Sequence, residues 1–94
     1  MRLTGFIHFD PADPIYQDHF PDNPVVPGSL ILDAFCRVIH QHLNVSVQRM
    51  YRFRFLSFVK TGDAQYSITI KDGCAICELS QRDKVCASGR IDLC

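Results

Sequence analysis

A nearly continuous apolar segment, residues 28 to 43, constrains the fold of this 94-residue chain most strongly. Pro27-Gly28-Ser29 is typical of a helix start. The residues that follow would place apolar side chains on almost every face of that helix: Leu30, Ile31, Leu32, Ala34, Phe35, Cys36, Val38, Ile39 and Leu43. A helix that is apolar nearly all round is a buried helix. Because 94 residues suffice for one domain only, we expect a sheet of the same domain to wrap it.

The remaining segments supply the strands. Apolar and polar residues alternate with the period of two that is typical of half-buried strands, in residues 2–9, 51–55, 65–71, 74–80 and 85–93. Turn signals separate the later ones, at Thr61-Gly62-Asp63, at Asp72-Gly73 and at residues 81–84. The sequence therefore predicts an α+β fold, in which one long central helix is wrapped by an antiparallel sheet of about five strands. Residues 1–94 would form a single domain.

Composition excludes several classes of protein. The chain is 47% hydrophobic and 21% charged, as ordinary globular proteins are. It has no apolar stretch of about 18 residues that could span a membrane, and its first residues show no secretory signal, so we expect a cytoplasmic protein without membrane attachment. The formal net charge is zero, which argues against nucleic acid as a partner.

Charge is nevertheless distributed unevenly. Residues 10 to 33 contain five acids and no Lys or Arg, whereas residues 34 to 62 contain five bases and no acid. Charge pairing within the fold, or simple solvation, would explain this pattern. A basic patch that attracts an acidic partner or a phosphate-bearing ligand would explain it equally well. The bases are Arg37, Arg49, Arg52, Arg54 and Lys60.

The five cysteines do not suggest a disulfide framework or a zinc site. Their number is odd, and Cys74 and Cys77 should face opposite sides of a strand because they are three residues apart. A zinc site needs four convergent ligands, and no second pair is present in the sequence. We therefore expect buried free thiols and no metal.

Residues 10 to 27 contain all five prolines and are predicted to form an ordered loop without regular structure. This loop would hold His19 near the helix N-terminus, and Asp33 would follow one or two turns into the helix, a plausible acid/base arrangement. Burial among apolar neighbours would raise the pKa of Asp33, as a general acid requires. The alternatives are that His19 caps local backbone, that Asp33 forms an i,i+4 salt bridge with Arg37, and that Gly28 merely permits the turn.

The segment from His19 to Asp33 resembles a known family. It reads His-Phe-Pro-x-x-Pro-Val-x-Pro-Gly and then an apolar helix, with an acid 14 residues after the histidine. This pattern is similar to that of the 3-hydroxyacyl-acyl-carrier-protein dehydratases, the FabA/FabZ family of hot-dog folds. The flanking segments 13–18 and 53–63 are also similar to the family, and the resemblance runs from about Thr4 to Leu93.

The resemblance implies a function and a site. The chain would dehydrate 3-hydroxyacyl-acyl-carrier-protein thioesters to trans-2-enoyl thioesters, in fatty-acid or polyketide-like biosynthesis. His19 would be the base, Asp33 the acid of the FabA type, and the N–H of Gly28 the donor to the thioester carbonyl. No metal or redox cofactor is implied. The partners would be the acyl carrier protein, whose pantetheine arm enters past basic residues, and a second copy, since family members are dimers in which histidine and acid come from different subunits.

Two other functions fit the same fold. A hot-dog thioesterase would use a helix carboxylate to activate water and would not need His19. A non-catalytic acyl-binding subunit would keep the fold without turnover. The absence of His19 or Asp33 would favour this alternative, but both residues are present. Family members usually carry an additional segment before the strand at residues 2–9. Because Met1 stands almost at that strand, we expect a sheet edge or part of the acyl tunnel to be uncovered.

Overall fold

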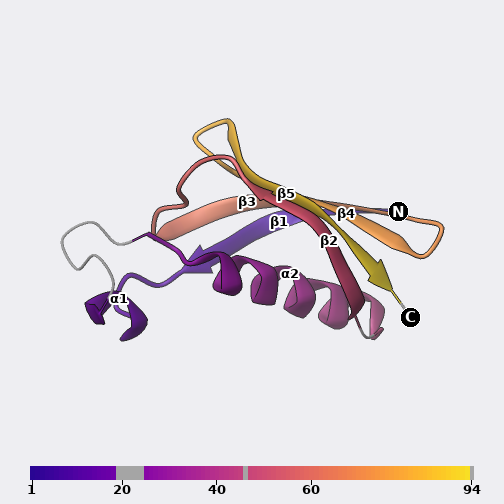
Figure 1. Cartoon of the computed structure of the whole chain (residues 1–94), viewed down its shortest axis with the longest axis horizontal. Helices are drawn as coiled ribbons and strands as arrows, with labels where there is room; N and C mark the ends of the chain where they lie inside the picture. Colours follow the sequence, from indigo (N-terminus) through magenta and orange to yellow (C-terminus); the bar gives the residue numbers. More distant parts are fainter. Residues whose placement is uncertain (19–24, 46, 94) are drawn as a thin grey trace.

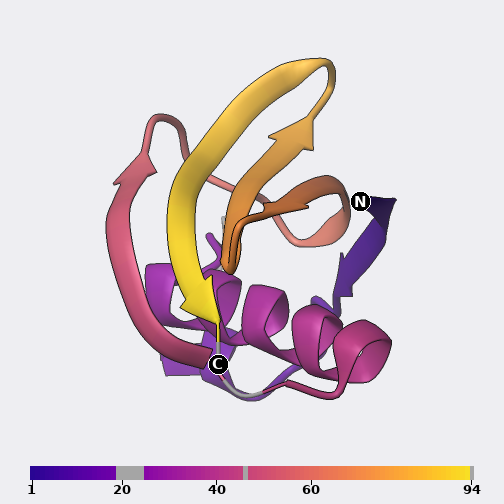
Figure 2. The same cartoon turned by 90° about the vertical axis from the view of Figure 1, so that its right-hand side faces the viewer.

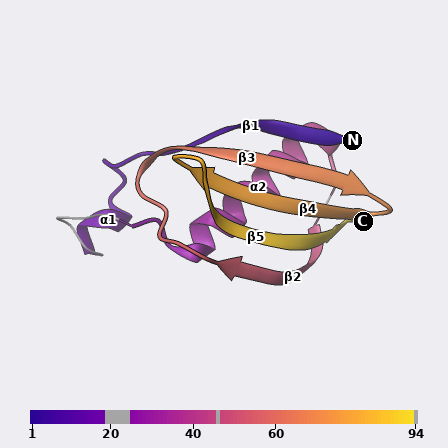
Figure 3. The same cartoon turned by 90° about the horizontal axis from the view of Figure 1, so that it is seen from above.

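The computed structural model describes residues 1–18, 25–45 and 47–93, without the side chains of residues 17, 18 and 47–52. Five antiparallel strands form one sheet in the order β1-β3-β4-β5-β2, with α2 lying along one of its faces (Figures 1 and 3). The elements in chain order are β1 (Arg2–Phe9), α1 (Ile15–Asp18), α2 (Gly28–Leu43), β2 (Val47–Phe55), β3 (Gly62–Lys71), β4 (Cys74–Gln81) and β5 (Lys84–Leu93). The predicted arrangement of one long helix and five antiparallel strands is confirmed.

The strand boundaries follow the turn chemistry closely. Asp72 and Gly73 both have positive φ, 53° and 76°, and connect β3 to β4 as a two-residue hairpin. Arg82 and Asp83 do the same between β4 and β5 with φ of 51° and 61°, although neither is a glycine. β1 and β2 are the two edges of the sheet. The turn predicted around Gly62 is shorter than expected, since β3 already begins at that residue.

The prediction that residues 10 to 27 contain no regular structure is wrong at one place. A short helix, α1, begins at Ile15 because Asp13 caps it: the N–H of Ile15 donates to Asp13 Oδ1 at 3.1 Å, and the N–H of Tyr16 donates to the Asp13 carbonyl at 3.1 Å. An acid before Pro14 is a regular helix start, because proline at the first helical position needs no hydrogen-bond partner. This signal was present in the sequence.

The helix α2 begins and ends where the sequence predicts. Its C-terminus is closed by Asn44, whose φ of 53° is left-handed and whose N–H donates to the His40 carbonyl at 2.9 Å. Only the stripe of Ile31, Phe35 and Ile39 is buried. The sheet predicted to wrap the helix is confirmed, since the strands curve around α2 (Figure 2), but complete burial is limited to this stripe. Its other apolar residues are half-buried: Leu30, Leu32, Ala34, Cys36, Val38 and Leu43.

The core lies between this stripe and the inner face of the sheet. Phe35 and Ile39 are completely buried, and they share the core with alternate residues of the central strands: Ala64, Tyr66, Ile68, Ala75, Cys77, Leu79, Ala87 and Ile91. Burial, and to a smaller extent the neighbouring Cys36 thiol, raises the pKa of Cys77 to about 12. A thiol with this pKa stays protonated at neutral pH, so Cys77 acts as a small apolar side chain.

Gly89 on β5 has no room for a side chain, because the ring of Phe53 from β2 covers it. A Cβ at Gly89 would lie 2.4 Å from Cγ of Phe53, and Phe53 is itself held against Phe35, with ring centroids 5.9 Å apart. We expect Gly89→Ala to lower the free energy of unfolding by about 1–3 kcal/mol, measured by urea denaturation. Ser88→Ala, one residue earlier, is the control.

The double variant Gly89→Ala/Phe53→Leu tests the cause. Because the clash involves these two side chains, the two substitutions should together cost less than the sum of their separate effects. A Gly89→Ala protein as stable as the wild type would contradict the steric assignment.

Candidate functional site

Among the described residues, no side chain caps the N-terminus of α2. The carbonyl of Pro27 accepts from the N–H groups of Leu30 and Ile31, at 3.0 and 3.3 Å. Within the described residues, the N–H of Gly28 has no acceptor. First-turn N–H groups and the helix dipole both favour negative charge on a ligand. Within the described part of the chain, the first turn of this 16-residue helix thus has N–H groups that an outside oxygen could bind.

An apolar cavity of about 240 Å³ adjoins Gly28. It is formed by the strand-like segment before the helix, the first turns of the helix and the segment after β2, with the lining Val25, Val26, Pro27, Gly28, Ile31, Phe55, Ser57, Phe58 and Val59. The walls are tied together by backbone, since the N–H of Val26 donates to the Val59 carbonyl at 2.8 Å. Such a cavity suits an alkyl chain whose polar end reaches Gly28.

Asp33 is not buried in the single chain, contrary to the expectation from its apolar sequence neighbours. Its side chain is 57% exposed and forms an ion pair with Arg37 one turn later. The predicted alternative, an i,i+4 salt bridge, is therefore confirmed. The reason is angular: Asp33 lies off the buried stripe of Ile31 and Phe35, on the side of the helix that the sheet leaves open.

Asp33 and Arg37 line a second cavity, of about 170 Å³, together with residues from β1, α1 and the start of α2. Tyr16 closes one side of it and is only 4% exposed. Burial, followed by the charges of Asp13 and Asp10, raises the pKa of Tyr16, so its hydroxyl stays neutral at physiological pH. Gly28 is not part of this cavity, and Asp33 is not part of the cavity at Gly28.

His19, the third predicted site residue, lies outside the described residues. The described residues on both sides of it are held in place. Tyr16 is buried before it, and after it Val25 forms a β-bridge with Lys60. The structure thus places Gly28 and Asp33 on one helix but against different cavities, and leaves the role of His19 untested.

A third cavity, of about 410 Å³, is lined by basic residues, of which the sequence predicts only one as part of a basic patch. Lys60 belongs to the predicted basic set, but Arg82 of the β4–β5 turn and Lys84, the first residue of β5, join it from a distant part of the sequence. Gln81 holds the two segments together: its amide Nε2 donates to the Lys60 carbonyl at 2.8 Å, and its Oε1 accepts from the Lys60 N–H at 2.9 Å. Among the residues that line this cavity, Asp63 is the single acid, against three bases.

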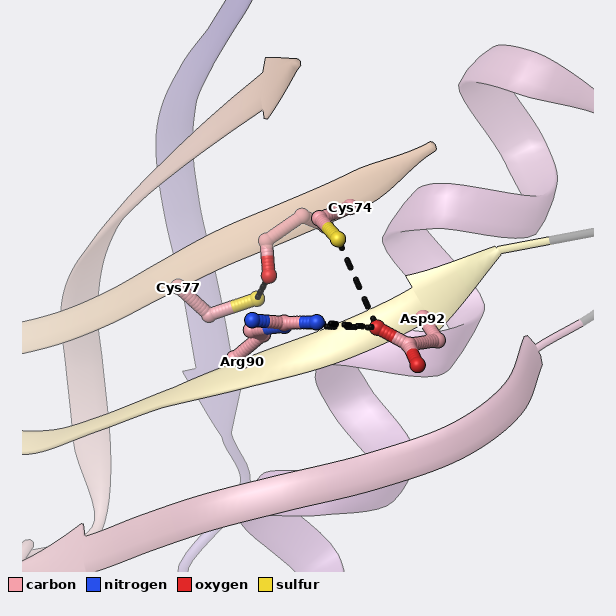
Figure 4. Close-up of polar contacts among 5 residues, drawn as sticks. Cys74, Cys77, Arg90 and Asp92 are labelled. Carbon is pink, nitrogen blue, oxygen red and sulfur yellow. Dashed lines mark hydrogen bonds and ion pairs between the residues drawn. The ribbon is translucent and has the colours of Figure 1, made fainter. Parts of the chain in front are cut away.

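The cysteines behave as the alternation of β4 predicts. Cys77 is in the core, whereas Cys74 lies on the opposite face, where its thiol donates to Asp92 Oδ1 at 3.4 Å and Arg90 binds the same carboxylate (Figure 4). Of the other two cysteines described, Cys86 is buried and Cys36 half-buried, and all four are free thiols. Cys94 lies outside the described residues. In the described part of the chain, no group of three or more His, Cys, Asp or Glu could hold a metal ion.

Comparison with known families decides the relationship. The sequence profile of the ApeI-like family, described as "ApeI dehydratase", matches residues 2–90. The chain belongs to the ApeI-like dehydratase family. Among curated proteins similar to it, a FabZ 3-hydroxyacyl-acyl-carrier-protein dehydratase of Thermotoga petrophila is 32% identical over 68 residues, which are 66% of this chain and 50% of the relative. A FabZ of Thermoanaerobacter sp. is 54% identical over 37 residues, 39% of this chain and 26% of the relative.

Solved structures establish the fold of this ApeI-like chain. The dehydratase heterocomplex ApeI:P of Xenorhabdus doucetiae superposes with a TM-score of 0.81 at 20% identity, covering 99% of this chain and 87% of that one. A protein of Archaeoglobus fulgidus gives 0.73 at 16% identity, covering 99% and 75%. The hot-dog fold predicted from the sequence is confirmed. The chain spans half or less of the length of the curated relatives named above. No helix in the described ranges is long and apolar enough to cross a membrane.

Proposed function

We propose that this ApeI-like protein dehydrates 3-hydroxyacyl thioesters of the acyl carrier protein to trans-2-enoyl thioesters, in fatty-acid or polyketide-like biosynthesis. The observation that carries the proposal is the open N–H of Gly28 at the head of α2, beside an apolar cavity. An oxygen that becomes negative during the reaction would be stabilised there. Family membership and the FabZ relatives support the same reaction class.

In the proposed mechanism, His19 removes the α-proton of the substrate and Gly28 N–H stabilises the negative charge that moves onto the thioester carbonyl oxygen. The bond from the β-carbon to its hydroxyl then breaks, and the electron pair left by the α-proton forms the new double bond. Asp33 protonates or orients the departing hydroxyl, which leaves as water. The reaction is redox-neutral and consumes no co-reactant.

A site built from two copies of the chain fits the separation of the site residues. Within one chain, Gly28 and Asp33 line different cavities, so a second copy would have to bring its Asp33 to the first copy's Gly28. We therefore propose a homodimer. The Xenorhabdus relative is a dehydratase heterocomplex, and a different hot-dog chain is the alternative partner.

The acyl carrier protein is proposed as the substrate carrier. Its pantetheine arm carries a phosphate, and the cavity that holds Lys60, Arg82 and Lys84 presents three exposed cations to such a group. Positive clefts of this kind attract acidic partners and raise their rate of association. This cavity supports the idea of a basic binding surface. Its bases are Lys60, Arg82 and Lys84, and only Lys60 belongs to the set predicted from the sequence.

A panel of 3-hydroxyacyl thioesters, on carrier protein and on coenzyme A, tests the function by mass spectrometry. We expect loss of water with the wild type, and a rate lower by a factor of about 10²–10⁴ with His19→Ala, because a general base of this kind contributes that much. His40→Ala is the matched control, since His40 is an exposed imidazole near the other end of α2.

The products separate the alternatives. Free acid in place of the enoyl thioester would show a thioesterase and refute the dehydratase. A folded protein that binds acyl thioesters without converting any of them would show an acyl-binding subunit. Equal activity of His19→Ala and wild type would remove His19 from the mechanism.

A further inference from the structure

We propose that Phe55 determines which acyl chain lengths this protein accepts, an inference that rests on the proposed dehydratase function. Phe55 is the last residue of β2, and its ring packs directly on Gly28. A Cβ at Gly28 would lie 2.9 Å from Cζ of Phe55, with two further ring atoms at 3.2 and 3.3 Å. The ring therefore lies beside the residue whose N–H would receive the thioester carbonyl, on the side where a Cβ would stand.

Phe55 also forms the wall between two cavities. It lines the apolar cavity of about 240 Å³ at Gly28, and it lines a neighbouring cavity of about 380 Å³ formed by residues 55 to 58. Ser57 and Phe58 border both cavities as well, and the atoms nearest to a Cβ at Gly28 all belong to the Phe55 ring. An alkyl chain that starts at Gly28 and extends from the smaller cavity into the larger one would pass this shared wall, in which the Phe55 ring lies next to Gly28.

The Phe55 side chain is exposed enough to change its conformation at the boundary of the cavities. Phe55 is 50% exposed, whereas the ring that sets the core, Phe35, is 0% exposed. A half-exposed ring loses few contacts when it turns or is truncated, so substitutions should alter the cavity without unfolding the protein. Because each buried methylene is worth roughly a fourfold change in affinity or kcat/KM, a wall of this kind produces a sharp preference for length.

Two substitutions of opposite effect test the proposal. We expect Phe55→Ala to join the cavities and to shift the optimum of kcat/KM toward longer 3-hydroxyacyl chains, by about fourfold per added methylene. Phe55→Trp should shift the optimum toward shorter chains. Leu56→Ala is the matched control: Leu56 is the next residue, is 60% exposed and lines only the larger cavity, so its loss should leave the optimum unchanged.

Binding of a series of alkyl-pantetheine thioethers of increasing length, measured in parallel by calorimetry, separates this proposal from the proposed reaction. If the wild type converts no thioester, the dehydratase function fails, and the length dependence of binding still decides the role of Phe55. A uniform loss with Phe55→Ala at every length, in turnover and in binding, would overturn the proposal. The same shift with Leu56→Ala would overturn it too.

Discussion

Asp33→Asn is expected to lower kcat by a factor on the order of 10²–10⁴ while leaving the fold intact. The protonated carboxyl group of Asp33 is the acid of the proposed elimination, and the amide of Asn cannot donate a proton in its place. Stability should fall by only about 0.5 kcal/mol, because the ion pair of Asp33 with Arg37 is exposed and pairs of this kind contribute little. Steady-state turnover and urea denaturation of the same preparations measure the two quantities.

Arg37→Gln is the matched control for this experiment. It breaks the same ion pair but keeps the carboxylate, so it should show the small loss of stability and a much smaller loss of kcat. Asp33→Asn with wild-type kcat would contradict the assignment of the acid. Equal losses of kcat in both variants would instead show that the ion pair, not the carboxylate alone, is required.

Mixing the two inactive variants tests whether the site is shared between copies. If His19 and Asp33 of one site come from different subunits, a dimer of one His19→Ala chain and one Asp33→Asn chain contains one intact site. Activity should therefore appear on mixing after subunit exchange, and a forced monomer should be inactive. An active monomer, or no recovery in a verified mixed dimer, would show that each chain carries a separate site.

The second large effect concerns stability: Phe35→Ala is expected to lower the free energy of unfolding by about 3–5 kcal/mol. Phe35 is completely buried between α2 and the sheet, and its ring contacts Phe53 at a tilt of 46°. Truncation removes buried apolar area and leaves a cavity that rigid strands cannot close. Domains of this size are typically stable by only about 5–15 kcal/mol, so the variant should be close to unfolding.

Phe58→Ala is the control for this prediction. It removes the same side chain from a position that is 81% exposed, and it should change the unfolding free energy by less than about 0.5 kcal/mol. Both variants are compared by urea denaturation at one protein concentration, since dimer formation would add a concentration-dependent term. A loss below about 1 kcal/mol for Phe35→Ala would show that Phe35 is not central to the core.

Much of the fold follows from local pattern. The helix from Gly28 to Leu43 was predicted with its correct bounds, because proline before it and the apolar segment within it are local signals. Alternation placed the strands, and Asp72-Gly73 placed a hairpin that needs positive φ at both residues. α1 lies within the residues predicted as a loop, because five prolines in residues 10 to 27 outweigh the single local helix start at Asp13 and Pro14.

The surroundings of the site residues depended on tertiary structure. Apolar neighbours in sequence suggested a buried Asp33, but exposure depends on which side of the helix the sheet covers. Sequence spacing alone determined α2, the strands, the two hairpin turns and the family motif from His19 to Asp33. Only the curvature and order of the strands brought the ring of Phe55 onto Gly28 and Lys60 beside Arg82, since contacts between distant segments arise from packing and not from local periodicity.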